Sequence, residues 1–296
     1  MAALELKEIK GNTFYIPSPA NIGVYADNGR AYLIDSGNDK EAGRQICRLI
    51  ESRGWKLELI FNTHSNADHC GGNAFIQQKT GCRIASTAIE AAFMENPLLE
   101  PSLLSGGYPH SGTRNKFLMA QPSKVTDIII PGETVPGTPL VTFALPGHFL
   151  GMAGIQTPDN IVFLADTLFS EHIVGKYGIF YLFDIEEHLK TLDMLENLKA
   201  DFYLPSHAQL TESITDLIKV NRAKIMEIAL KITELCTGEA EHDNILAGLC
   251  SAYGIELNDN QYVLVKSAVQ AYLSYLFQKG DLVKEYRAGR LFWKKN

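Results

Sequence analysis

One short stretch of this 296-residue sequence concentrates side chains that could do chemistry. Within residues 62–72, His64, Asp68 and His69 fall inside six consecutive positions. The stretch follows the apolar segment 57–61, which predicts a strand, and it precedes a predicted helix. Imidazole and carboxylate groups are the usual zinc ligands outside thiolate sites. The stretch therefore predicts part of a metal site.

Three more residues of ligand type each stand at the end of an apolar run. His148, Asp166 and His207 follow segments that predict strands. Strand ends in a packed sheet place their side chains in a shared crevice. Any one of these histidines, taken alone, is more often a surface or hydrogen-bonded residue. Four such segments in this order predict one common site.

The series of motifs resembles the signature of the metallo-β-lactamase superfamily, which is HxHxDH, then Gly-His, then an Asp after a strand, then a final His. The likeness covers about residues 10–210. It implies an α/β fold, the αββα sandwich, with metal ions at one edge of the sheet pair. It implies two groups of metal ligands: His64, residue 66 and His148 for the first ion, Asp68, His69 and His207 for the second, with Asp166 bridging them. It also implies that Asp35 supports the site from behind the ligands.

The sequence departs from this pattern at Asn66, which stands in place of the second histidine. Asparagine offers a neutral amide oxygen, a harder and weaker donor to zinc than an imidazole nitrogen. The second position keeps its full set of ligands. We therefore expect one firmly held zinc ion there and a labile ion at the first position, where iron or manganese could replace zinc.

The expected ligands define a hydrolytic mechanism. A bound metal ion acidifies water and polarises the carbonyl or phosphoryl oxygen under attack. We expect Asp68 to ligate a metal, to orient the attacking water and to accept its proton, which makes it the predicted catalytic residue. No nucleophilic side chain is needed, so Ser65 and Cys70 are interpreted as loop packing.

Strands and helices alternate through about residue 212, which predicts an α/β domain over residues 1–212. The expected elements are a hairpin at 21–34, helices at 40–52, 73–79, 88–94 and 185–197, and strands at 57–61, 83–86, 127–130, 140–145, 153–157, 161–165 and 202–204. The stretch 96–126 breaks this rhythm with several prolines and glycines. Because it is also rich in apolar residues, it is predicted to be a packed insertion that walls a pocket.

Residues 213–296 are predicted to form a second domain. Amphipathic helices at 214–235, 244–253 and 261–279 precede a hairpin near the end of the chain, an order that is winged-helix-like. A metal domain, an apolar insertion and such a tail resemble the glyoxalase II-like and lactamase-beta-2-like branch of the superfamily. The tail helices could support a homodimer or cover the sandwich.

In that branch the insertion and the C-terminal domain shape the substrate cleft. The corresponding segments here are 99–107 and 171–178. In the second segment, Lys176 and Tyr177 could bind a substrate carboxylate or phosphate, or they could be ordinary surface residues. The remaining histidines predicted to lie on the surface are His110, His188 and His242.

Composition limits the partners. A formal net charge of −7 argues against nucleic acid, because duplex binding draws on a basic footprint. No run approaches the roughly 18 apolar residues of a membrane span, and the N-terminus lacks the pattern of a secretory signal. The five cysteines lack CxxC spacing and suit reduced thiols. These features predict a cytoplasmic protein that acts on a small molecule.

Three functions remain open on the sequence. The glyoxalase II-like resemblance favours hydrolysis of a small ester or thioester. Other branches cleave phosphodiesters or RNA, and the C-terminal ribbon could touch phosphate. Its net charge of +3 comes from five basic residues against two acidic ones: Lys284, Arg287, Arg290, Lys294 and Lys295, with Asp281 and Glu285. The third function is a catalytically degenerate scaffold with one structural metal, which Asn66 leaves open. β-Lactam hydrolysis is not expected, because those enzymes are normally exported.

Overall fold

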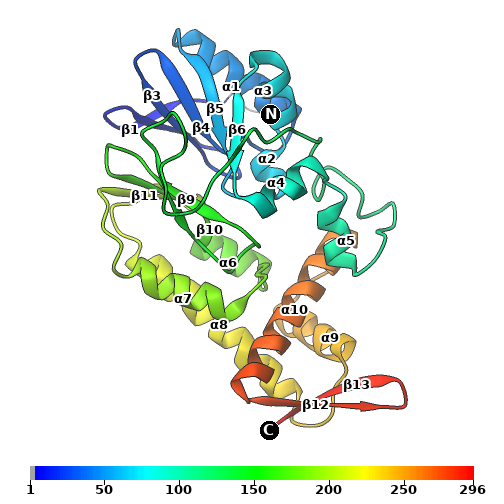
Figure 1. Cartoon of the computed structure of the whole chain (residues 1–296). Helices are drawn as coiled ribbons and strands as arrows, with labels where there is room; N and C mark the ends of the chain where they lie inside the picture. The colour runs from blue at the N-terminus through cyan, green and yellow to red at the C-terminus, as the bar shows by residue number, and fades with distance from the viewer. Residues whose placement is uncertain (1–3) are drawn as a thin grey trace.

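The computed structural model describes residues 4–296, so the first three residues of the segment judged for a secretory signal lie outside the described part. Two sheets pack face to face, and helices cover both outer faces (Figure 1). This arrangement is the αββα sandwich that the sequence predicts. Apolar residues from both sheets fill the space between them, among them Tyr32, Phe61, Ile155, Phe163 and Leu204.

The first sheet has seven strands that lie in chain order. Its strands are β1 (Lys7–Lys10), β2 (Thr13–Ile16), β3 (Ile22–Asp27), β4 (Arg30–Ile34), β5 (Lys56–Phe61), β6 (Arg83–Ser86) and β7 (Asp127–Ile128). The predicted hairpin is β3 and β4, closed by Asn28 and Gly29 with φ of 49° and 75°. From β4 to β7 neighbouring strands run parallel. Their carboxyl ends therefore meet at one edge of the sheet.

The second sheet has four strands in the order β11-β10-β9-β8. They are β8 (Val141–Ala144), β9 (Ala153–Gln156), β10 (Ile161–Phe169) and β11 (Phe202–His207). β10 runs parallel to β11 and antiparallel to β9. The parallel pair brings the ends of β10 and β11 together at the edge where the first sheet presents its own strand ends.

Helices supply the outer layers. Those of the sandwich are α1 (Lys40–Ser52), α2 (Ala67–Cys70), α3 (Asn73–Thr80), α4 (Ala88–Glu95), α5 (Leu99–Ser105), α6 (Glu171–Tyr177) and α7 (Ile185–Leu195). α1 shows why the chain folds this way locally. Asp39 caps it by accepting hydrogen bonds from the N–H groups of Glu41 and Ala42, each at 3.0 Å. Ile46 and Ile50, one turn apart, are buried on its inner face.

The rest of the chain forms α8 (Thr215–Leu235), α9 (His242–Tyr253), α10 (Asp259–Lys279) and the antiparallel ribbon β12 (Leu282–Arg287) with β13 (Arg290–Lys295). These match the predicted tail helices and hairpin. One apolar cluster continues from the second sheet into this region, through residues such as Leu164, Ile225, Tyr272 and Trp293. The tail therefore shares a core with the sandwich, while its winged-helix-like character and a domain boundary at 212/213 stay predictions.

The insertion at 96–126 is packed in part. It contains α5, and its residues Leu104 and Leu118 are buried against Val263 of α10. Tyr108 and Phe117, by contrast, are 76% and 69% exposed. The insertion therefore bridges the sandwich and the tail, and α5 lies beside α10 in Figure 1.

Several short elements are absent from the sequence prediction. These are the hairpin β1–β2 at the sheet edge, the single turn α2, α5 inside the insertion, and α6. In addition, β10 and β11 extend beyond their predicted ends at 165 and 204. Segments of four to seven residues are too short to show a clear hydrophobic periodicity. The described residues also contain no helix long and apolar enough to cross a membrane.

Candidate metal centre

The predicted ligands meet at the shared edge of the two sheets. His64, Asp68 and His69 lie between β5 and α3, and His148 lies in the connection from β8 to β9. Asp166 and His207 were predicted to follow strands, but they lie within the last residues of β10 and β11. The prediction ended both strands early because the chain changes from apolar to polar at these residues.

At three points of the site the backbone adopts a positive φ, which changes the direction of the chain. Asp35 has φ 64°, Ala165, just before Asp166, has φ 49°, and Gly147, just before His148, has φ 121°. The β10–β11 register also shifts at Ala165. Residues other than glycine rarely adopt positive φ, so the fold holds strained backbone at this site.

Two groups of side chains each place three ligand atoms within 4.8 Å of one another. The first group is His64, His148 and Asp166, and the second is Asp68, His69 and His207. Asp166 also touches the second group, because its carboxylate oxygens lie 3.2 Å from His69 Nε2 and 3.1 Å from His207 Nε2. Asp166 therefore lies between the two groups, and its bridging of two ions stays a prediction.

Each of the four histidines has its Nδ1 atom occupied on the side away from the cluster. The partners are Asp35 Oδ2 for His69, Thr63 Oγ1 for His64, the Tyr181 carbonyl for His148 and the Pro19 carbonyl for His207, at 2.7–3.1 Å. A carbonyl or carboxylate oxygen accepts, so Nδ1 is the donor in His69, His148 and His207, and their Nε2 atoms face the centre. This arrangement of outer partners is characteristic of histidines that ligate metals.

Asp35 supports both groups at once. Its carboxylate accepts hydrogen bonds from His69 Nδ1 at 2.8 Å and from the Thr63 hydroxyl at 2.9 Å. The Thr63 oxygen in turn lies 3.0 Å from His64 Nδ1. Because its hydroxyl hydrogen goes to Asp35, that oxygen is free to accept from His64. Asp35 therefore acts on the second group directly and on the first group through Thr63.

The unpartnered atoms at the centre fit a bound cation. His64 Nε2, His69 Nε2 and Asp166 Oδ1 are buried without a hydrogen-bond partner, although they lie close together. Buried polar atoms are normally satisfied, so this set marks a place where a positive ion would complete the contacts. Two imidazoles with a carboxylate in each group is a donor set that suits zinc.

The electrostatics of the cluster are dominated by its carboxylates. Burial opposes the charged form of His207, but Asp166 and Asp68 outweigh it and raise the pKa of His207 to about 10. Burial and the charge of His69 instead hold the pKa of His64 well below its usual value. Asp68 and Asp166 therefore affect the pKa of His207, in the second group, more strongly than that of His64, in the first.

Asn66 stands beside the first group. Its Oδ1 lies 3.2 Å from His148 Nε2, and its Nδ2 donates to Glu100 Oε1 at 2.9 Å. The amide oxygen therefore faces the first metal position, where the superfamily pattern has an imidazole. The sequence singled out the segment that contains Glu100 as a pocket wall, but it gave no sign of this pairing.

Two aromatic residues that the sequence did not single out also border the cluster. The ring of Phe169 stacks on His207 with centroids 5.8 Å apart, and Tyr181 lies edge-on to His148 at 5.7 Å. Phe169 follows Asp166 by three residues in β10, and that proximity was the available signal. Tyr181 lies in a connection between helices and carried none.

Four other residues discussed in the sequence analysis lie outside the two ligand groups. Lys176 and Tyr177 are exposed at the end of α6, with Lys176 Nζ 5.0 Å from the Tyr177 ring centroid, and neither belongs to a ligand group. Their role in substrate binding stays a prediction. Ser65 and Cys70 are buried in the loop, where the Ser65 hydroxyl donates to Glu90 and the Cys70 thiol to the Ser65 carbonyl, as packing residues would.

The surface assignment is correct for His110 and wrong for two other histidines. His188 is fully buried on the inner face of α7, and burial, reinforced by His148, lowers its pKa to about 3. It lies on the same helical stripe as Ile185 and Leu192, a pattern that predicts burial. His242 is only partly exposed, because its ring packs against α10 and contacts the Lys266 carbonyl.

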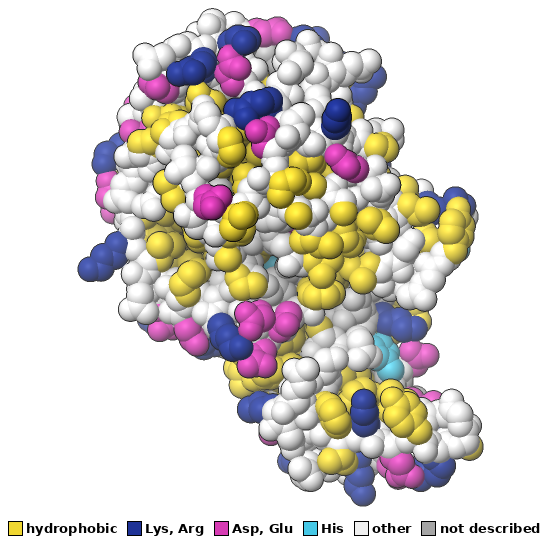
Figure 2. All heavy atoms as spheres, in the orientation of Figure 1, with side chains coloured by type: hydrophobic (Ala, Val, Ile, Leu, Met, Phe, Trp, Pro, Cys, Tyr) yellow, Lys and Arg dark blue, Asp and Glu magenta, His cyan; other side chains and the backbone are white. Residues whose placement is uncertain are grey.

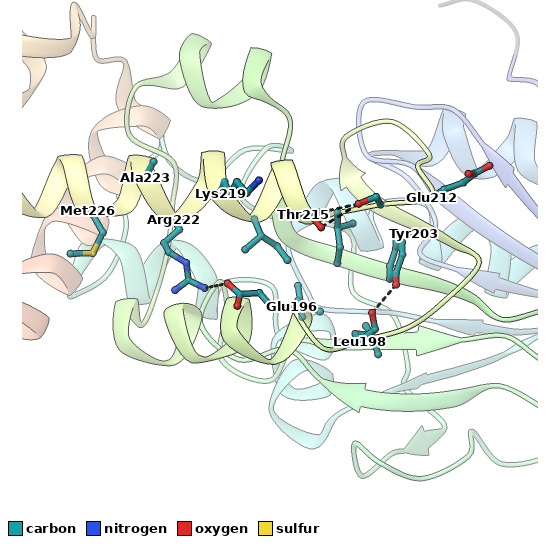
Figure 3. Close-up of a pocket in the computed structure, with 13 residues that line it drawn as sticks. Glu196, Leu198, Tyr203, Glu212, Thr215, Lys219, Arg222, Ala223 and Met226 are labelled. Atoms are coloured by element: carbon teal, nitrogen blue, oxygen red, sulfur yellow. Dashed lines mark hydrogen bonds and ion pairs between the residues drawn. The ribbon is translucent and has the colours of Figure 1, made fainter.

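A groove of about 640 Å³ lies elsewhere, between α7 and α8 (Figure 3). Two of its polar side chains already have partners. Arg222 pairs with Glu196 at 2.9 Å, and the Tyr203 hydroxyl donates to the Leu198 carbonyl at 2.7 Å. None of its lining residues belongs to either ligand group. Both ligand groups found among the described residues therefore lie at the sheet edge and not in this groove.

The chain belongs to the metallo-beta-lactamase superfamily, whose family model matches residues 15–207. Its curated relatives include a hydroxyacylglutathione hydrolase from Rhizobium meliloti (strain 1021), 28% identical over 174 residues, which are 57% of this chain and 54% of that protein. The chain thus spans about half the length of the curated relatives it matches.

Two solved structures resemble the whole chain. One is a beta-lactamase domain protein from Burkholderia ambifaria, with a TM-score of 0.76 and 16% identity over 99% of this chain and 94% of that one. The other is a metallo-beta-lactamase family protein from Thermus thermophilus, with a TM-score of 0.73 and 17% identity over 99% of both chains. At these identities the likeness shows the fold, including the arrangement of the tail helices.

Proposed function

We propose that this chain is a metal-dependent hydrolase that cleaves a small ester or thioester. The observation that carries the proposal is the convergence of four inward-facing Nε2 atoms on Asp166, with buried atoms left unpartnered at the centre. The relatives named hydroxyacylglutathione hydrolase support an acyl substrate.

The proposed ligands have different roles. When bound, zinc or a similar divalent ion acidifies water and polarises a carbonyl oxygen. Asp68 is the ligand whose carboxylate is most open, 45% exposed against 6% for Asp166. It is therefore the residue that can both hold a metal and take up the proton of an attacking water. His69 and His207 are the other two ligands that we propose for the metal position of Asp68.

The first position is the weaker one in this proposal. Asn66 contributes a neutral amide oxygen beside His64 and His148. A neutral oxygen gives zinc less than an imidazole nitrogen does. We infer one firmly bound ion, held by Asp68, His69 and His207, and one labile ion.

Charge pairing in the tail supports a small-molecule substrate rather than nucleic acid. Arg287 and Arg290 of the ribbon pair with Glu239 and Glu241, so these two charges are already neutralised. Acidic and basic side chains are mixed over this lower part of the molecule (Figure 2). Lys284, Lys294 and Lys295 make no ion pair among the described residues, but Glu239 and Glu241 reduce the net charge of the ribbon surface from +3 to +1. A phosphate-binding surface draws on a stronger basic footprint than this.

The test combines metal analysis with a substrate screen. Chelator-treated protein is reloaded with zinc, manganese or iron and assayed against ester, thioester and phosphodiester panels. We expect metal-dependent cleavage of esters or thioesters, and its loss in His207→Ala but not in the exposed-histidine control His110→Ala. A metal-loaded protein that is inert on all panels would support the degenerate scaffold instead, and cleavage of phosphodiesters alone would refute the acyl substrate.

A further inference from the structure

A buried carboxyl group on the insertion meets the residue at which this sequence departs from its superfamily. Glu100 lies in the first turn of α5 and is only 5% exposed. Its Oε1 accepts a hydrogen bond from Asn66 Nδ2 at 2.9 Å. Burying a carboxyl group costs free energy unless the group is hydrogen-bonded, so the contact with Asn66 stabilises Glu100 in the interior. The contact joins two segments that are 34 residues apart.

The two ends of the Asn66 amide face different partners. Its NH₂ group faces Glu100, and its Oδ1 faces His148 Nε2 at 3.2 Å, on the side of the first metal position. The backbone of Asn66 is already fixed, because its carbonyl accepts from the His69 and Cys70 N–H groups at the start of α2. Rotation of the side chain is the remaining freedom. An acceptor opposite the NH₂ group selects the orientation in which Oδ1 points to the metal.

Glu100 is itself held on an anchored element. Leu104, one turn further along α5, is buried with Leu118 against Val263 of α10. The insertion is also tied to α10 by a hydrogen bond from Asn115 Nδ2 to Asn260 Oδ1 at 2.8 Å. The carboxyl therefore reaches Asn66 from a packed helix rather than from a free loop, and such support preserves the geometry of a ligand.

We propose that Glu100 is a positioning residue for Asn66, which fixes the amide oxygen toward the first metal position and so makes the occupancy of that position depend on the insertion. Outer partners of metal ligands set ligand orientation, and their removal typically weakens metal binding by 10–100-fold. The proposal rests on the function proposed above, since it requires the two metal positions. Glu100 lies outside both ligand groups and acts through Asn66.

The test measures metal affinity at each position separately. Zinc binding is followed by competition with a chromogenic chelator, and the visible spectrum of bound cobalt(II) reports the ligand set. His64→Ala and His207→Ala assign the two positions. Glu100→Leu removes the acceptor at similar volume, whereas Glu100→Gln keeps an oxygen that can accept from Asn66. Each Glu100 variant is also made with Asn66→Ala.

We expect Glu100→Leu to weaken zinc binding at the first position about tenfold and to leave the second position, the internal control for folding, within about twofold. Glu100→Gln should restore the first position to within about threefold of the parent. With Asn66→Ala in place, Glu100→Leu should have no further effect.

Three results would overturn the proposal: equal weakening of both positions by Glu100→Leu, an undiminished effect in the Asn66→Ala background, or no effect at all. Failure of the proposed function looks different, because a parent protein that binds metal but cleaves no ester or thioester would still show these differences in zinc affinity among the Glu100 variants.

Discussion

In the proposed metal centre, the second position has three ionisable ligands, Asp68, His69 and His207, whereas the first combines His64, His148 and Asp166 with the neutral amide of Asn66. The connection after β5 contributes to both, and both lie at the same sheet edge. Relative to the superfamily pattern, the first position departs at one side chain, Asn66, which lowers the expected strength of metal binding there without changing the fold around it.

The outer supports of the two positions differ as well. At the second position Asp35 contacts His69 directly at 2.8 Å, whereas at the first position it reaches His64 only through the Thr63 hydroxyl. The first position adds Glu100, which contacts Asn66 from the insertion. At the first position, where we expect a labile ion, the contact between Asp35 and His64 is thus indirect and passes through a neutral hydroxyl. At the second position, the contact between Asp35 and His69 is direct and involves the carboxylate itself.

Removal of the Asp166 carboxylate, which contacts both groups, should abolish the difference in metal affinity between the two positions. Asp166 contacts histidines of both groups, so Asp166→Ala should weaken both positions by about 100-fold or more, the upper range for the loss of an outer partner alone. Elemental analysis after dialysis should then find neither ion, with His110→Ala as the control. Retention of the second ion would show that Asp166 serves the first position alone.

Asp35→Asn should weaken both positions together, by about 10–100-fold. The amide cannot accept from Thr63 and His69 as the carboxylate does, while asparagine tolerates the positive φ at this residue, so the backbone is preserved. Zinc affinity at each position is the measurement. A loss confined to the second position would mean that the Thr63 relay carries no support to His64.

Asn66→His should make the zinc affinities of the two positions more similar. An imidazole at this point restores the ligand pattern of the superfamily, and we expect the first position to bind zinc about tenfold more tightly, equivalent to about 1.4 kcal/mol. Two zinc ions per chain should then survive dialysis. If the parent protein already holds two ions tightly, the first position is not labile and the comparison fails.

The smallest expected effect separates the direct support from the relayed one. Thr63→Val keeps the side-chain shape and removes the hydroxyl between Asp35 and His64. We expect affinity at the first position to fall about fivefold, the equivalent of one hydrogen bond of about 1 kcal/mol, with the second position unchanged. Chelator competition on the purified variant measures this, and a loss at the second position would contradict it.

Much of the fold was predictable because its elements have strong local signals. The β3–β4 hairpin carries a turn that needs positive φ, and α1 carries a capping aspartate and an apolar stripe. The histidines and aspartates that converge at the sheet edge were predictable as well, because they follow apolar strands and their order matches a known superfamily. What failed were short or half-exposed elements, such as β1 and α6, and the burial of His188.

The sequence by itself determined which side chains are of metal-ligand type, in what order they occur, and that Asn66 departs from the superfamily pattern. Only the tertiary structure decided how those side chains are aimed. Glu100 meets Asn66 because the insertion packs on α10, and the Nδ1 atoms of His148 and His207 are held by the backbone carbonyls of Tyr181 and Pro19. Every residue has a carbonyl, so the residue types along the chain cannot mark which one will be the partner, and long-range packing makes that choice.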